Sequence, residues 1–174
     1  MDVARAALDG GATWLGVTSL AEAVPLREGG LRAPVLSWLN PVEVDVVAAV
    51  GHGVDLAVAS VAHLDRLVAH GVVVRVHLHL DTGPARDGAP PAGWDVLCAA
   101  LRRAETAGHV RVVGVMGHLR CADGPADAAN GAGRAAFLVA ACSRNATACA
   151  GQCGISPPRP PHCRVRPVTS TWSG

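Results

Sequence analysis

The stretch Arg75-Val-His-Leu-His-Leu-Asp-Thr-Gly83 carries the strongest fold signal in this chain. Side chains alternate across a β-strand, so one face of this stretch carries its polar residues, Arg75, His77, His79 and Asp81. Three aliphatic residues share the opposite face. Four polar side chains on one face of a buried strand need hydrogen-bond partners or water. The stretch therefore predicts a buried strand whose polar face holds either an internal hydrogen-bonded layer or a functional site.

Short runs rich in Val and Leu, each bounded by Gly, Asp or Pro, occur on both sides of this strand. We expect buried parallel strands at residues 14–18, 34–39, 56–60, 72–81 and 110–118. Helical stretches alternate with them, at residues 20–27, from Asn40-Pro41 to about Gly51, and at residues 61–69 and 94–107. This alternation predicts a parallel α/β fold, and periodicity alone leaves open whether the sheet is a barrel or an open sheet.

Polar residues before the helical stretches predict where the helices begin. Ser19 followed by Glu22 is the pattern of a capping box, and Gly29-Gly30 is expected to stop that helix. Asn40 is expected to cap the next helix, with Pro41 at its first helical position.

The composition limits the range of functions. The chain has 174 residues, of which 50% are hydrophobic, and a net charge of +1, so we expect one domain with a real core. There is no basic patch with interleaved aromatic residues, so we expect no nucleic-acid partner. No apolar run reaches the roughly 18 residues that a membrane helix needs, and the first residues do not resemble a signal peptide. We therefore expect no membrane partner and a cytoplasmic location.

All basic residues are arginine, and the chain contains neither lysine nor tyrosine. A cofactor that forms a Schiff base with an enzyme needs a primary amine on the protein. The absence of lysine is therefore a chemical limit on any activity of that kind.

The pattern of strands and helices weakens beyond about Arg134. Residues 135–142 are compatible with a helix, whereas residues 143–174 are rich in proline and are expected to be disordered. We therefore divide the chain into an α/β domain, residues 1–134, and a low-order tail, residues 135–174, which a change of reading frame would explain. The alternative for the tail is a zinc site built from Cys149, Cys153, His162 and Cys163.

Polar residues at the ends of two predicted strands are candidates for chemistry. His118 ends the strand at residues 110–118, at the same end as Asp81, and Arg86 lies in the loop after Asp81. One interpretation is a metal-dependent hydrolase whose ligands come from His77, His79, Asp81 and His118. The other is that the strand ends and Arg86 hold a phosphorylated cofactor. Each residue also has a structural interpretation, as a packed histidine or a solvated arginine.

Five stretches in unbroken order resemble one enzyme family. They lie at residues 11–27, 33–38, 53–60, 75–86 and 113–118, and the last reads Val113-Gly-Val-Met-Gly-His118. Over about residues 2–134 they resemble strands two to six of the barrel domain of bacterial alanine racemases. The resemblance implies a partial (β/α)8 barrel of the TIM type, within the α/β class. It also implies pyridoxal phosphate as cofactor, interconversion of L- and D-alanine, and a homodimer.

The same resemblance implies roles for individual residues. Arg86 matches the arginine that contacts the phenolic oxygen of the cofactor, and His118 matches the histidine at the cofactor site. At the position of His79, many family members have a lysine that supports this arginine. The catalytic lysine and tyrosine of the family have no counterpart in this sequence. We therefore expect a racemase-like chain that is inactive alone, with the hydrolase and a non-enzymatic cofactor-binding remnant as alternatives.

Overall fold

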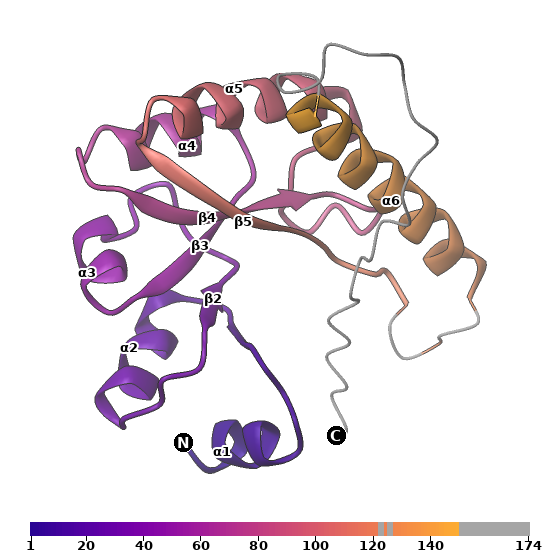
Figure 1. Ribbon diagram of the computed structural model, residues 1–174. Coiled ribbons are helices and arrows are strands. Elements are labelled where there is room, and N and C mark those ends of the chain that lie inside the picture. Colours follow the sequence, from indigo (N-terminus) through magenta and orange to yellow (C-terminus); the bar gives the residue numbers. More distant parts are fainter. Residues whose placement is uncertain (122–123, 125–126, 150–174) are drawn as a thin grey trace.

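The computed structural model describes residues 1–121, 124 and 127–149 of the chain (Figure 1). Its strands are β1 (Leu15–Val17), β2 (Val35–Ser37), β3 (Val54–Val58), β4 (Val74–Leu80) and β5 (Val110–Gly117). Its helices are α1 (Asp2–Asp9), α2 (Leu20–Glu28), α3 (Val46–Gly51), α4 (Val61–Val68), η1 (Pro91–Gly93), α5 (Trp94–Thr106) and α6 (Ala128–Cys149). From β1 onward strands and helices alternate, which confirms the predicted α/β class.

The strands follow one another in the sheet in the same order as in the sequence, and every neighbouring pair is parallel. A doubly wound sheet reverses its strand order and carries helices on both faces, whereas a barrel keeps the order and places its helices outside. Figure 1 shows α2 to α5 arranged along the outer side of the sheet. The five strands therefore form part of a barrel wall, with one face toward the helices and the other toward the barrel interior.

The helix-facing side of the sheet carries the main hydrophobic core. Leu56, Val76 and Leu78 are fully buried on this side, and leucines of α4 and α5 pack against them, namely Leu64, Leu67, Leu97 and Leu101. Burying such a side chain contributes about 1.5–3 kcal/mol, which is why these alternate positions are apolar. The intervening residues of β4 are polar, as the alternation in the sequence predicted.

Strand β3 begins at Val54, two residues before the predicted start at Leu56. Gly53 adopts a φ of 62° directly before it, a conformation that glycine accepts without steric cost. All five residues of the strand are buried, including Asp55. Because Asp55 is charged, the sequence pattern did not indicate that the strand already starts at Val54.

The helix expected to start at Asn40-Pro41 starts at Val46 instead. The Ser37 hydroxyl donates a hydrogen bond to Asn40 Oδ1 (2.6 Å), and Asn40 Nδ2 donates one to the Ser37 carbonyl (2.8 Å). Asp45 caps α3 by accepting a hydrogen bond from the Ala48 N–H (2.9 Å). The prediction that Asn40 caps the helix is wrong because its side chain closes a local turn.

Helix α2 begins after Ser19 as predicted, but the Ser19 side chain makes no capping hydrogen bond. The Glu22 carboxylate instead accepts hydrogen bonds from the hydroxyl (2.7 Å) and the backbone N–H (2.9 Å) of Thr18. These bonds lower the pKa of Glu22 because they stabilise its charged form. At α4 the expected cap is present, since the Ser60 hydroxyl accepts a hydrogen bond from the His63 N–H (3.1 Å).

Helix α6 crosses residue 134 and continues seven residues past Cys142, where the sequence predicted that regular structure ends. Alanine, which has the highest helix propensity, is abundant along this helix. Most of the predicted disordered segment, and three of the four candidate zinc ligands of the tail, lie outside the described residues. None of the helices that the structure describes has the length and apolar character needed to cross a bilayer.

Strand β5 has a neighbour on one side only among the described strands. Its register with β4 shifts between Val76 and His77, which leaves Val113 without a partner. The Glu105 side chain of α5 accepts a hydrogen bond from the Val112 N–H (2.8 Å). Strand β5 therefore has an extra residue, Val113, and a backbone donor, the Val112 N–H, that already has a partner in the Glu105 side chain.

Arg27 ties the end of α2 to two neighbouring segments. Its guanidinium donates hydrogen bonds to four carbonyl groups, those of Leu31 (2.9 Å), Ala33 (2.7 Å), His52 (2.8 Å) and Gly53 (3.0 Å).

Replacing Arg27 with methionine is expected to lower the free energy of unfolding by about 2 kcal/mol, because these carbonyls lose a charged donor. Urea denaturation measures the change. Lysine at this position keeps the charge but not the forked donor geometry, so R27K should recover only part of the loss. Equal stability of R27M and the wild type would contradict this role.

Candidate functional site

The segments that follow β4 and β5 are joined by hydrogen bonds. The Thr82 hydroxyl donates to the His118 carbonyl (2.6 Å), and the Arg120 guanidinium donates to the Gly83 carbonyl (2.6 Å). Parallel strands end at the same edge of a sheet, and in barrels this edge carries the functional groups. The structure therefore connects the loop that contains Arg86 to the strand end that contains His118.

Residues 81–89 form a loop that turns back onto the end of β4. Asp81 Oδ1 accepts hydrogen bonds from the N–H groups of Gly83 (2.9 Å) and Ala85 (3.1 Å). At the far end of the loop, the Ala89 carbonyl accepts a hydrogen bond from the Asp81 N–H (2.8 Å). Hydrogen bonds of the Asp81 side chain and backbone N–H thus hold both the beginning and the end of the loop.

Arg86 occupies the tip of this loop and is exposed. Its neighbours Ala85 and Asp87 have φ angles of 51° and 57°, in the left-handed region that residues with a Cβ rarely adopt. Such backbone conformations cost on the order of 1 kcal/mol each and cluster at ligand-binding sites. Within the described part of the chain the Arg86 guanidinium has no hydrogen-bond partner, so it is available to a bound group.

His118 directly follows β5, and its ring packs against the indole of Trp38. The ring centroids are 6.0 Å apart and the planes are tilted by 37°. Trp38 directly follows β2, so the contact spans the interior of the partial barrel from one strand end to another. Both side chains are half-buried.

His79 is fully buried, and neither of its ring nitrogens has a hydrogen-bond partner among the described residues. Its Nδ1 lies 3.5 Å from Asp87 Oδ2 of the loop. Burial lowers the pKa of His79 because the imidazolium would lose its hydration, and this effect outweighs the nearby Asp87 carboxylate. His79 is therefore a neutral imidazole at neutral pH. It does not supply the charge of the lysine that the resemblance places at this position.

Closer to the start of β4, the polar face forms a hydrogen-bonded layer inside the barrel. The Asp55 carboxylate accepts two hydrogen bonds from Arg75 (2.6 and 3.1 Å) and lies 3.2 Å from His77 Nε2. The Trp14 ring meets the His77 ring edge-on, with centroids 5.2 Å apart. Burial acts to raise the pKa of the Asp55 carboxyl, but the hydrogen bonds from His77 and Arg75 outweigh burial and lower it. At Arg75 and His77, the structural interpretation of the polar face is the one that the structure supports.

The residues considered as metal ligands, His77, His79, Asp81 and His118, do not form a metal site. His77 lies beside Asp55 and His79 lies beside Asp87, so the two histidines are next to different carboxylates. Over residues 1–121, 124 and 127–149, no group of three or more His, Cys, Asp and Glu side chains is placed to hold a metal ion. The metal-dependent hydrolase is therefore not favoured.

Sequence analysis did not single out Asp55 and Trp38. The signal for Asp55 was a carboxylate inside the apolar run Val54–Val58, since such a group needs a buried partner. The signal for Trp38 was its position near the end of the strand predicted at residues 34–39, as His118 ends the strand predicted at residues 110–118. Neither signal names the partner, because both contacts join segments far apart in the sequence.

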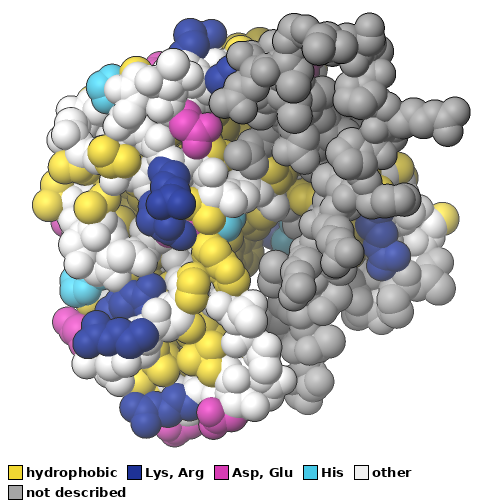
Figure 2. Space-filling model, viewed as in Figure 1, with side chains coloured by type: hydrophobic (Ala, Val, Ile, Leu, Met, Phe, Trp, Pro, Cys, Tyr) yellow, Lys and Arg dark blue, Asp and Glu magenta, His cyan; other side chains and the backbone are white. Residues whose placement is uncertain are grey.

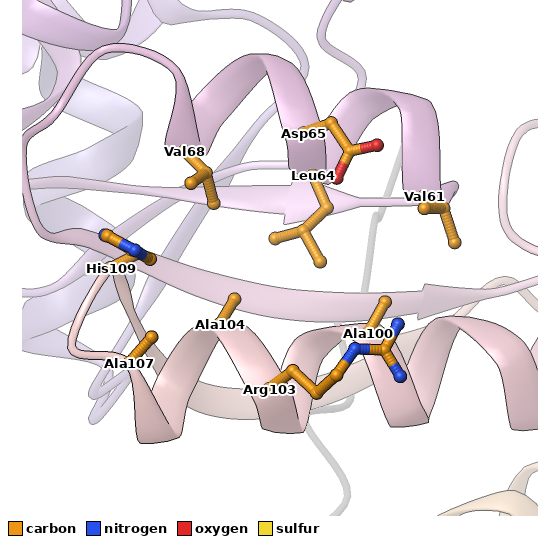
Figure 3. Close-up of a pocket in the computed structure, with 9 residues that line it drawn as sticks. All are labelled: Val61, Leu64, Asp65, Val68, Ala100, Arg103, Ala104, Ala107 and His109. Carbon is orange, nitrogen blue, oxygen red and sulfur yellow. The ribbon is translucent and has the colours of Figure 1, made fainter.

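A hollow of about 390 Å³ lies between α4 and α5 on the helix side of the sheet (Figure 3). Figure 3 shows Leu64 and Val68 pointing from α4 toward α5, with Arg103 on the facing helix. The hollow is not at the carboxyl ends of the strands. It is a groove between two packed helices and is separate from the candidate site.

Hydrophobic side chains also reach the surface, as Figure 2 shows beside the arginines of the viewed face. The most exposed are Val3, Val47, Val73 and Val96, which are far apart in the sequence and lie in α1, in α3, before β4 and in α5. Single exposed apolar side chains are common on folded proteins and do not mark a site.

Comparison with known proteins identifies the relatives of this chain. The sequence model described as "Alanine racemase, N-terminal domain" matches residues 1–154. The alanine racemase of Thermobifida fusca is 44% identical over 138 residues, which are 77% of this chain and 37% of that protein. The alanine racemase of Salinispora tropica is 47% identical over 126 residues, 70% of this chain and 34% of that protein. The chain thus spans little more than a third of the length of these relatives.

Solved structures give the same result for the fold. The alanine racemase from D-cycloserine-producing Streptomyces lavendulae superposes with a TM-score of 0.77 at 32% identity, covering 88% of this chain and 40% of that one. The enzyme from Streptomyces coelicolor A3(2) gives 0.76 at 35% identity, covering 83% and 40%. These matches confirm the recognised family and the partial barrel, and the chain belongs to the alanine racemase family, as a part of its N-terminal barrel domain.

Proposed function

We propose that this chain is the cofactor-facing part of an alanine racemase barrel, in which Arg86 and His118 bind pyridoxal phosphate without a covalent bond. The observation that supports this most is the hydrogen bond from Thr82 to the His118 carbonyl, which joins the Arg86 loop to the end of β5. The exposed Arg86 guanidinium suits a phenolate or phosphate oxygen, since it is a planar donor that is always charged.

The residues present fit the non-covalent part of such a site but not the covalent attachment of the cofactor. When bound in an enzyme, pyridoxal phosphate stabilises the carbanion that forms at the α-carbon of an amino acid. The imine link requires a lysine amine, and this sequence has none. The chain's own residues therefore bind and orient a ligand, and racemisation requires a lysine amine and a tyrosine, which this sequence does not contain.

The relatives also support wider proposals about the protein to which this sequence contributes. We propose that it acts on alanine, is a homodimer and is located in the cytoplasm. We further propose that residues 1–134 form the barrel part and residues 135–174 a separate tail.

Pyridoxal phosphate is expected to bind the purified chain reversibly, and the substitution Arg86→Gln is expected to weaken binding about tenfold. The reason is the loss of a charged hydrogen-bond donor while a polar side chain is kept. Absorbance titration gives the dissociation constants. Arg32→Gln removes another exposed arginine, before β2, and should bind like the wild type. Equal binding by R86Q and the wild type would contradict the role of Arg86.

Borohydride reduction of the same mixture separates binding from covalent chemistry. Without lysine, the N-terminal amine of Met1 is the one primary amine of the chain, so mass spectrometry should find the reduced adduct there and nowhere else. A stable adduct on an internal peptide, or racemase activity of this chain alone, would overturn the non-covalent assignment.

A further inference from the structure

The side chain of His79 is a base that the folded chain encloses completely. It lies near the end of β4, is 0% exposed, and has no hydrogen-bond partner at either ring nitrogen among the described residues. An imidazolium in this position would lose its hydration, and no hydrogen bond would replace it. The closed structure therefore holds the ring in its neutral form.

The groups that act on the charge of His79 come from the loop at residues 81–89 and from the end of β5. They are two carboxylates and one histidine, Asp87, Asp81 and His118. Asp87 Oδ2 lies 3.5 Å from His79 Nδ1, which is longer than a good hydrogen bond. The carboxylates favour the charged ring and His118 opposes it, but burial has the largest effect and lowers the pKa of His79. Protonation of His79 is thus unfavourable as long as the loop is closed.

The loop contacts His79 through its backbone as well as through Asp87. The Ala89 N–H donates a hydrogen bond to the His79 carbonyl (2.8 Å). The Ala89 carbonyl accepts hydrogen bonds from the Asp81 N–H (2.8 Å) and from the indole N–H of Trp94 (2.6 Å). Release of the loop breaks these contacts and opens this side of His79 to water. The released state therefore binds a proton more readily than the closed state, so acid favours release.

The loop can open without disturbing the strands beneath it. Residues 85–87 are exposed, whereas β4 is buried except at Arg75. Ala85 and Asp87 have φ angles of 51° and 57°, and this strain is relieved when the loop is released. Local opening involves segments with few buried contacts. We therefore expect the loop to open more often than the sheet unfolds.

We propose that the loop at residues 81–89 is a pH-sensitive switch, which is closed while His79 is neutral and is released when His79 is protonated. Release carries Arg86, at the tip of the loop, away from the strand end that holds His118. The switch is a property of the ligand-free chain, so it does not depend on the proposed binding of a cofactor.

The dependence on pH follows from the direction of the pKa shift. The pKa of His79 lies below its ordinary value of 6.5 in the closed state and returns toward that value in the open state. The closed loop therefore keeps its full stability above about pH 6.5 and loses stability as the pH falls toward the lower pKa. For one proton, the equilibrium constant for opening should rise about tenfold between about pH 7.5 and about pH 5.5.

Amide hydrogen exchange of the ligand-free chain, followed by NMR over this pH range, tests the proposal. The amides of Ala89 and Asp81 report on the loop, because their hydrogen bonds close it. The amide of Leu56, in the central strand β3, reports on unfolding of the sheet. After correction for the intrinsic pH dependence of exchange, the loop amides should show the rise of about tenfold. They should also be less protected than the Leu56 amide at every pH.

Two substitutions distinguish the switch from a general effect of acid. His79→Leu removes the titrating ring and should abolish the rise, and the variant should fold because the ring nitrogens have no hydrogen bond to lose. His63→Leu is the matched control. His63 is also buried, at 5% exposure, and burial lowers its pKa against the effect of Asp87 and Glu43, but it belongs to α4. H63L should therefore retain the rise at Ala89 and Asp81.

The outcomes either support or overturn the switch. A rise in H79L equal to that of the wild type, or the absence of a rise in the wild type, overturns it. Loop amides as protected as Leu56 at every pH also overturn it, because the loop would then open only when the sheet unfolds. If H79L does not fold, His79→Gln gives the same comparison with a polar side chain that does not titrate. Failure of the chain to bind pyridoxal phosphate would refute the proposed function and leave the switch in place.

Discussion

The substitution Asp55→Ala is expected to lower the free energy of unfolding by about 3 kcal/mol, because it breaks a buried charge pair by removing one partner. Asp55 is 2% exposed and accepts two hydrogen bonds from Arg75. Its loss leaves His77 without its carboxylate partner inside the barrel. The Arg75 side chain is 41% exposed and regains some hydration, which limits the effect. Urea denaturation at neutral pH measures the difference.

The same carboxylate makes the stability depend on pH. Because the pKa of Asp55 is lower in the folded chain than its ordinary value of 3.8, its contribution is present above that value. The contribution is lost as the pH falls through the lower folded pKa, since protonation ends the charge pair. Wild-type stability should therefore fall more steeply than that of D55A below about pH 4. Parallel pH profiles of the two proteins, or equal stability at pH 7, would argue against the role of Asp55.

Replacing Gly88 with alanine is expected to destabilise the chain by more than about 3 kcal/mol. Gly88 has a φ of 91°, and a Cβ there would lie 2.6 Å from the Asp81 nitrogen and 2.7 Å from the Leu80 carbonyl carbon. These atoms belong to the backbone at the end of β4, so a flexible side chain cannot move aside to relieve the clash. The loop at residues 81–89 would have to detach, and binding of pyridoxal phosphate through Arg86 should weaken with it. Thermal and urea denaturation, together with the absorbance titration, measure both effects.

Gly71→Ala is the matched control for this prediction. Gly71 also has a left-handed φ, of 67°, but nothing lies within 4 Å of the position of its Cβ. It should therefore show only the conformational cost, about 1 kcal/mol. The excess for G88A over G71A isolates the backbone clash, and similar losses for both would show that the loop yields more easily than its packing implies.

Local sequence patterns were enough to predict the strands and most helices. The alternation from Arg75 to Asp81 predicted one polar and one apolar face, and the fully buried Leu78 shows that the apolar face forms the core. The cap at Ser60 is also as expected, because its partner lies three residues away. These features depend on residues close together in the chain, which is why the sequence alone contains them.

The errors and omissions arise where two interactions compete or where the partner is distant. Asn40 has a suitable cap side chain, but the bond to Ser37 competes with it, and Asp45 provides the cap instead. The pairing of Asp55 with Arg75 links residues 20 positions apart, on neighbouring strands. The Trp38–His118 contact depends on the curvature of the whole sheet. Spacing in the sequence does not encode these distances. The sequence therefore predicted that the candidate site lies at the strand ends, but not which side chains contact one another there.

The edge of β5 has a consequence for how these molecules behave at high concentration. A second chain that added its own strand there would have to displace the Glu105 carboxylate from the Val112 N–H and accommodate the extra residue at Val113. Both features oppose the regular ladder through which exposed strands recruit one another into fibrils. Among the described strands, the β5 edge is therefore a poor template for fibril growth.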